Sequence, residues 1–145
     1  MMTRLSVLFM AITLLSCSGS QIREPQSLYI DLLDYTPVEL IQELADSPRG
    51  HVFVNEAVHG WIEKDSVPAL VEIVSSDRRP SMSVSLTTSP FLDKGESTLA
   101  NEAYFMLLGY RHGVYPPAGN STRHTLEDFE TLKNLLIRED LITGM

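Results

Sequence analysis

The sequence lacks several features that define common functional classes. Cys17 is the only cysteine among 145 residues, which excludes an internal disulfide and a cysteine-rich zinc site. None of the four histidines stands in an H-E-x-x-H pattern, and no serine lies in a G-x-S-x-G pattern. Only one apolar run is long, residues 5–15, and its eleven residues fall short of the roughly 20 that span a bilayer. We therefore expect no metal site, no cofactor and no catalytic residues.

The N-terminus has the features of an export signal. Arg4 supplies a positive charge, residues 5–15 (LSVLFMAITLL) form an apolar stretch, and residues 18–26 are polar. A positive start followed by 7–15 apolar residues is typical of a signal peptide that is removed from the mature protein. We therefore expect residues 1–16 to be a signal peptide.

Residues 14–17, Leu-Leu-Ser-Cys, resemble the lipobox of bacterial lipoproteins. The resemblance implies cleavage after Ser16, attachment of diacylglycerol to the Cys17 thiol, and a lipidated tether over residues 17–27. Ser18, a residue other than aspartate, implies sorting to the outer membrane, on the side facing the periplasm. The alternatives are an anchor in the inner membrane, or an ordinary secretory signal with Cys17 incidental and a secreted product.

The charge of the chain limits its partners. Removal of residues 1–16 takes away one basic residue, Arg4, and leaves 10 basic and 19 acidic side chains, a formal net charge of −9. A surface of that sign repels nucleic acid and attracts basic proteins over long range. Besides the membrane that holds the lipid, we expect another protein as the partner, a basic one in particular, and no nucleic acid.

Residues 28–145 fit one domain, and their apolar spacing favours helices. Thr36 with Glu39, and Thr125 with Asp128, are typical of capped helix starts, while Gly113 is typical of a helix end. Residues 81–89 alternate apolar and hydroxyl side chains, which fits a short strand or a poorly formed helix. The predicted helices are residues 36–46, 52–62, 65–74, 97–113 and 125–141.

This pattern predicts a mainly α fold, a single small helical bundle or HEAT-like array of helix pairs with about five helices and room for one short strand. Similar apolar pairs at residues 40–41 and 70–71 hint at a repeat, although their spacing of thirty residues is short for HEAT repeats.

One group of side chains is a candidate binding edge. Tyr110, Arg111, His112 and Tyr115 gather at a predicted helix end, and tyrosine and arginine are favoured in interface hot spots. The alternative is structural: Tyr110 packs in the core, Arg111 and His112 complement the negative helix end, and Tyr115 covers the following loop. The histidines are otherwise expected to be solvated surface residues.

Two functions follow from these observations. The first is a lipid-anchored envelope protein whose acidic helical domain binds another protein, as an immunity protein against a toxin or as an envelope-assembly factor. The alternative is an envelope enzyme acting on cell-wall or lipid substrates, with catalytic residues that meet only in the folded chain. A cavity in which a histidine contacts a serine or carboxylate would favour the enzyme.

Overall fold

The computed structural model of the chain describes residues 26–46, 50–86, 97–117, 124–139 and 141–142. Cys17 and the predicted signal peptide and tether lie outside the described residues, apart from residues 26 and 27. Two short 3-10 turns, Leu32–Asp34 and Lys64–Ser66, accompany the main elements. In chain order these are β1 (Gln26–Ile30), α1 (Pro37–Asp46), β2 (Gly50–Val54), β3 (Val58–His59), α2 (Val67–Ser76), β4 (Pro80–Ser81), β5 (Ser83–Leu86), β6 (Ser97–Thr98), α3 (Leu99–His112), β7 (Val114–Tyr115) and α4 (Leu126–Arg138).

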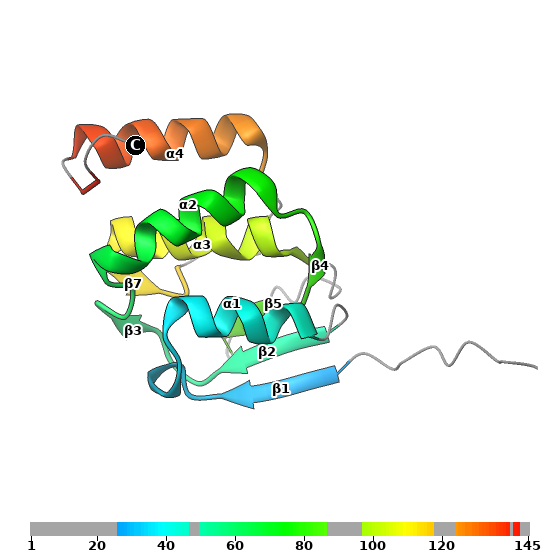
Figure 1. Cartoon of the computed structure of the whole chain (residues 1–145). Helices are drawn as coiled ribbons and strands as arrows, with labels where there is room; N and C mark the ends of the chain where they lie inside the picture. The colour runs from blue at the N-terminus through cyan, green and yellow to red at the C-terminus, as the bar shows by residue number, and fades with distance from the viewer. Residues whose placement is uncertain (1–25, 47–49, 87–96, 118–123, 140, 143–145) are drawn as a thin grey trace, which may run out of the picture.

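The main sheet consists of three parallel strands in the order β1-β2-β5. Leu28, Val52 and Val84 lie opposite one another across it. In the chain, α1 lies between β1 and β2, and α2 between β2 and β5, so two strand-helix-strand units follow each other. The helices are stacked above the sheet, with α4 farthest from it (Figure 1). The fold is mixed α/β, and the prediction of a mainly α bundle or HEAT-like array is wrong.

The predicted helix over residues 52–62 is the main local error, because the segment contains β2 and β3. In β2, Val52 and Val54 are buried while His51 and Phe53 between them are half-exposed, the alternation of a strand. Val54, Val58 and Trp61 have helical spacing in the sequence, but they lie in or next to β2 and β3 and not in a helix. Pairing with β1 and β5, which no local pattern reveals, decides the conformation.

Two small antiparallel pairs connect the remaining segments. β3 pairs with β7, and β4 pairs with β6, each over two residues. β5 confirms the strand alternative for the middle of residues 81–89, with Val84 buried against the helices. The short pairs bring β6, at the start of α3, next to β4, close to the point where α2 ends.

The capped helices form where the sequence predicts them. Glu39 Oε2 accepts a hydrogen bond from Thr36 N at 2.8 Å, and Glu39 N donates to Thr36 Oγ1 at 3.3 Å, which closes the first turn of α1. Thr125 and Asp128 make the same reciprocal box at α4. The predictions for α1, α2 and α4 are confirmed, although α4 ends at Arg138 and not at residue 141.

α3 is the central helix of the core. Its N-cap is Thr98, and it ends at Gly113, whose φ of 71° is the left-handed conformation that glycine adopts readily. It packs most extensively on α2 and also contacts α1, β7 and α4. A helix enclosed by neighbours buries side chains all round, and α3 does so. The buried positions are Leu99, Ala100, Asn101, Glu102, Ala103, Phe105, Met106, Leu107 and Gly109.

Candidate binding groove between α1 and α2

A groove with a volume of about 380 Å³ lies between α1, α2 and the start of α3. That volume lies near the lower end of the range of pockets that hold small ligands. Buried apolar side chains form its floor, half-exposed ones its walls, and polar groups its rim. The lining residues are Val38, Ile41, Gln42, Ala45, Ile73, Asp77, Arg79 and Leu99.

The groove exists because α1 has a wider apolar stripe than the core uses. Leu40 and Leu44 are fully buried beneath the helix. Val38 and Ala45, which are seven residues apart and therefore lie on one helix face, are only half-buried. Ile73 on α2 is half-buried in the same way. These three apolar side chains partly face solvent along one depression.

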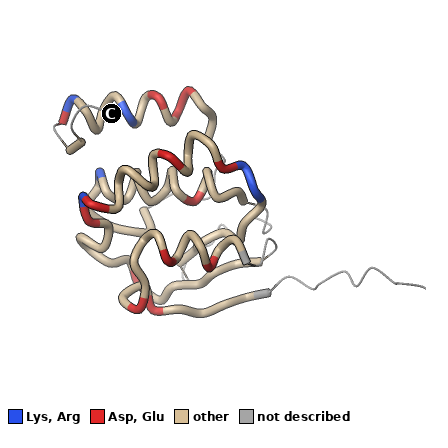
Figure 2. Tube along the Cα trace, viewed as in Figure 1, with Lys and Arg blue, Asp and Glu red and all other residues tan. Residues whose placement is uncertain are grey.

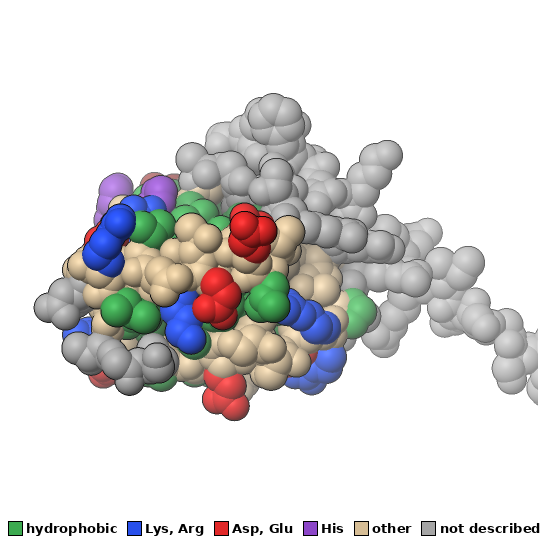
Figure 3. Space-filling view, turned by 90° about the horizontal axis from the view of Figure 1, so that it is seen from above, with side chains coloured by type: hydrophobic (Ala, Val, Ile, Leu, Met, Phe, Trp, Pro, Cys, Tyr) green, Lys and Arg blue, Asp and Glu red, His purple; other side chains and the backbone are tan. Residues whose placement is uncertain are grey.

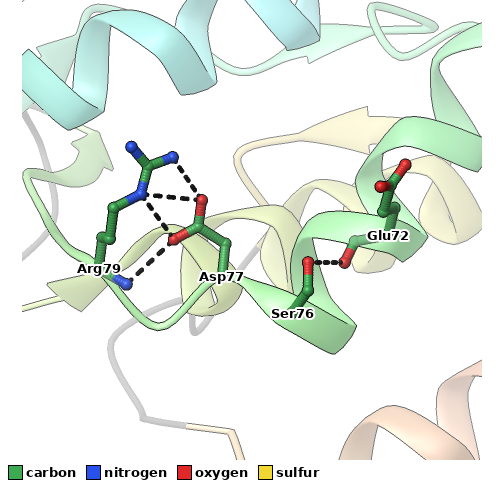
Figure 4. A network of polar contacts seen from close by, with 4 residues as sticks. All are labelled: Glu72, Ser76, Asp77 and Arg79. Atoms are coloured by element: carbon green, nitrogen blue, oxygen red, sulfur yellow. Dashed lines mark hydrogen bonds and ion pairs between the residues drawn. The ribbon is translucent and has the colours of Figure 1, made fainter.

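An ion pair stands at the rim of the groove (Figure 4). Arg79 Nη2 donates to Asp77 Oδ2 at 2.6 Å, and Arg79 Nε lies 3.0 and 3.1 Å from the two carboxylate oxygens. These hydrogen bonds hold the pKa of Asp77 below its usual value and raise the pKa of Arg79. The arginine side chain is 72% exposed, so its outer nitrogen faces solvent beside the apolar walls.

The backbone fixes this rim to the core. Asp77 is the C-cap of α2, and its carbonyl accepts from Ala100 N at 2.9 Å. The Arg79 carbonyl accepts from Leu99 N at 3.0 Å. In Figure 4 the Glu72 carboxylate points away from the ion pair, while its carbonyl accepts from Ser76 Oγ at 2.8 Å. These hydrogen bonds connect the segment that carries the ion pair to the first turn of α3.

No protein-family model, curated protein or solved structure matches this chain. The interpretation of the groove therefore depends on its own chemistry. Its lining contains no histidine, cysteine, serine or threonine among the described residues. An apolar depression with a charged rim is suited to holding an apolar group in place, and it offers no nucleophile for a reaction.

The predicted binding edge lies elsewhere, at the end of α3, and its members have separate surroundings. Tyr110 Oη donates to the Leu141 carbonyl at 3.1 Å, and Arg111 makes a two-pronged ion pair with Glu139 at 2.9 and 3.0 Å. The binding role of these residues stays a prediction. Their contacts tie α3 to the segment after α4.

The other two members of that group differ in exposure. His112 is exposed. Tyr115 is 1% exposed and stacks on Trp61 with ring centroids 5.0 Å apart. Any binding role of Tyr115 would therefore act through positioning and not through direct contact with a partner.

Two histidines are not simple surface residues, contrary to the expectation. His51 Nδ1 lies 2.9 Å from Ser83 Oγ, across β2 and β5. His124 Nδ1 lies 2.9 Å from Asn101 Oδ1, and its ring stacks on Tyr104 at a centroid distance of 4.5 Å. Burial, together with the charge of Arg78, lowers the pKa of His124. Both pairs join residues distant in sequence, so local spacing could not reveal them.

A buried carboxyl group is the least expected polar feature. Glu102 is 3% exposed, and Ser97, Asn101 and the backbone of Val84 surround it. Burial raises its pKa to about 7, although the hydrogen bonds from these neighbours oppose the shift. The carboxyl group is closed off from solvent, so a substrate cannot reach it in this conformation.

The described part of the chain contains neither a membrane-spanning helix nor a metal-binding cluster. None of the helices described there has the length and apolar character needed to cross a bilayer. Nor do the residues in these ranges bring three or more histidine, cysteine, aspartate or glutamate side chains together as a metal site.

Proposed function

We propose that the chain is a lipid-anchored protein of the bacterial cell envelope, facing the periplasm, whose acidic domain binds another protein at the groove between α1 and α2. The lipobox-like residues 14–17 support the anchor. The observation that carries the binding function is the groove of about 380 Å³, in which half-exposed apolar walls lie beside a fixed ion pair.

The surroundings of the groove favour a basic partner. Glu39 and Glu43 lie on α1 beside the groove, and the formal net charge of the whole chain is −8, although the rim itself also carries Arg79. Opposite charge accelerates association, while a buried apolar or aromatic anchor supplies most of the affinity in many interfaces. The partner would insert one such side chain between Val38 and Ile73. An immunity protein and an envelope-assembly factor would both use the groove in this way.

The binding proposal is tested by blocking the groove without disturbing the core. Gln42 lines the groove and is exposed, so Gln42→Arg fills the opening and repels a basic partner. Asn134, exposed on α4, gives the matched control Asn134→Arg with the same change of charge. The partner is captured from solubilised membranes, identified and purified, and its affinity is measured by titration calorimetry. We expect at least tenfold weaker binding for Gln42→Arg alone, about 1.4 kcal/mol.

Equal affinities for the two arginine variants would show that the groove is not the interface. Circular dichroism verifies that both variants keep the helical content of the unmodified chain. The control position Asn134 is on α4, where charged and apolar side chains are mixed on the surface (Figure 3). This surface therefore differs from the apolar groove between α1 and α2.

The anchor is tested separately, through Cys17. Mass spectrometry of the membrane fraction is expected to find the acyl mass on an N-terminal Cys17 peptide, and Cys17→Ser is expected to release the domain into the soluble fraction. A soluble mature form without acyl mass, or a Cys17→Ser chain that stays in membranes, would contradict lipidation. The groove experiment is unaffected by that outcome, because it measures binding to the domain.

An envelope enzyme is the second candidate, and one observation favours it: His51 Nδ1 lies 2.9 Å from Ser83 Oγ. A histidine in this position could accept the serine proton. A fluorophosphonate probe tests the idea, since a reactive Ser83 would be labelled and the Ser83→Ala variant would not. Labelling of both chains to the same extent, or of neither, would contradict this candidate.

A further inference from the structure

One face of the parallel sheet is open over β1 and β2. The register places Tyr29 beside Phe53, and Ser27 beside His51, on the face opposite the buried Val52 and Val54. Tyr29 is 70% exposed, and Phe53 and His51 are half-exposed. The described helices lie on the other side of the sheet (Figure 1). Parallel sheets are normally covered on both faces, so this one is suited to a contact outside the domain.

The open face is aromatic and carries no charge. The ring of Phe53 stacks on Tyr29 and on His51, with centroid distances of 5.2 and 5.7 Å. Strands β1, β2 and β5 contain no charged residue, although 21% of the chain is charged. In Figure 2 the acidic positions lie on the helices and in the turns, with none within these strands. The three strands therefore bring no acidic side chain of their own to this face, so they add no charge repulsion toward an anionic surface.

The chain before β1 limits how far this face can lie from the membrane. Eight residues, 18–25, separate Cys17 from Gln26, the first residue of β1. An extended chain advances at most about 3.6 Å per residue, so β1 begins within about 30 Å of a lipid attached to Cys17. A short tether of this length keeps the adjoining strand at a high effective concentration near the bilayer.

We propose that the sheet face centred on Tyr29 and Phe53 lies against the phospholipid surface that holds the Cys17 lipid. This inference depends on the lipidation in the proposed function. Aromatic side chains favour the boundary between headgroups and acyl chains, where the tyrosine ring is buried and its hydroxyl stays hydrated. The sheet then faces the membrane, and the groove between α1 and α2 stays open to a partner on the helical side.

The sole cysteine allows a direct test. The chain from residue 17 is coupled through its Cys17 thiol to a maleimide lipid, in vesicles of phosphatidylethanolamine and phosphatidylglycerol whose acyl chains carry bromine near the headgroup end. Tyr29→Trp places a fluorescent reporter on the open face, and Leu126→Trp places one on α4, at the opposite end of the domain (Figure 1). Trp61, the native tryptophan, contributes the same background to both chains.

We expect bromine to quench the reporter of the Tyr29→Trp chain at least twofold more than the reporter of the Leu126→Trp chain. A further variant, Phe53→Asp in the Tyr29→Trp chain, is expected to abolish the difference, because a carboxylate at the centre of the face is repelled by the lipid. Equal quenching of the two reporters, or stronger quenching of the one on α4, would overturn the proposal. If the coupled chain forms dimers and the sheet reporter is not quenched, the face contacts a second copy of the chain, and the membrane proposal is overturned as well.

This experiment separates the inference from the proposed function. Chemical coupling supplies the anchor, so the quenching result is independent of whether cells lipidate Cys17. If the acyl mass is found on Cys17 but the sheet reporter is not quenched, lipidation is supported and the membrane contact of the sheet face is contradicted. If the sheet reporter is quenched but Cys17 carries no lipid in cells, the sheet face contacts lipid and the lipidation of Cys17 is contradicted.

Discussion

Ser97 Oγ donates a hydrogen bond of 2.5 Å to Glu102 Oε1 inside the core. The other carboxyl oxygen, Oε2, accepts from Val84 N at 3.2 Å, so one side chain of α3 connects β6 with the edge of the main sheet. Asn101 Nδ2 also donates to Ser97 Oγ, at 3.0 Å. These bonds satisfy the group but do not offset its burial, and the pKa of Glu102 is raised to about 7.

The first prediction is that the protein loses stability as the pH rises toward neutrality. The pKa of Glu102 rises from 4.5 in the unfolded chain to about 7 in the folded one, so the folded state binds the proton more tightly. The resulting stability is fully present below pH 4.5 and is lost as the pH rises through 7. Linkage gives a loss of about 3 kcal/mol from this group. Urea unfolding from about pH 5 to about pH 8.5, across the range in which the group titrates, measures it.

Glu102→Gln isolates the contribution of this one group. The neutral amide keeps the shape of the side chain, and its oxygen can accept a hydrogen bond from Ser97 Oγ or from Val84 N. Because the amide does not titrate, the variant is expected to show no loss of stability from this group as the pH rises. It is therefore expected to be more stable than the unmodified protein at alkaline pH. A Glu102→Gln profile parallel to that of the unmodified protein would show that Glu102 does not titrate in this range.

The second prediction concerns the hydroxyl group of Tyr115. It is buried and has no hydrogen-bond partner among the described residues. Burial raises the pKa of Tyr115 strongly, and the charge of Glu102 adds to the shift. A buried hydroxyl without a partner costs about 1–3 kcal/mol, so Tyr115→Phe is expected to stabilise the protein while preserving the stacking on Trp61. Thermal unfolding measures the change, and a clear loss of stability would show that the hydroxyl has a bonding role.

The helices were predictable because their signals are local. Thr36 with Glu39, and Thr125 with Asp128, form capping boxes within four residues, and Gly113 ends α3 by its own backbone conformation. Side chains three and four positions apart determine the buried face of α2 in the same way. Interactions of this range are visible in the sequence itself.

The sheet and the polar contacts could not be found in this way. β2 becomes a strand because β1 and β5 lie on either side of it, 24 and 32 positions away in the register. The contact of His51 with Ser83 follows from that register, and the groove requires α1 and α2 to be placed by the same sheet. The predicted edge at residues 110–112 and 115 depends on residue type alone, and residue type does not distinguish the buried Tyr115 from the exposed His112.

The third prediction tests the cap of α4. Thr125 Oγ1 accepts from Asp128 N at 3.1 Å, and Thr125 N donates to the Asp128 carboxylate at 2.7 Å. Thr125→Ala removes the first bond and is expected to lower the free energy of unfolding by about 1 kcal/mol. Thr131→Ala, at an exposed position within the same helix, is the control and should be neutral or slightly stabilising. Equal effects of the two alanines in urea unfolding would contradict a capping role.

The fourth prediction sets helix propensity against packing at Gly109. Alanine in place of glycine within a helix gains about 1 kcal/mol from propensity. A Cβ at Gly109, however, would lie 2.9 Å from the Val114 carbonyl oxygen and 3.1 Å from the Tyr115 ring. Overpacking of this kind costs about 1–3 kcal/mol, and the backbone oxygen cannot move without disturbing the pairing of β7 with β3. Gly109→Ala is therefore expected to destabilise the protein, and an increase in its unfolding midpoint would show that the β7 turn can shift away from α3.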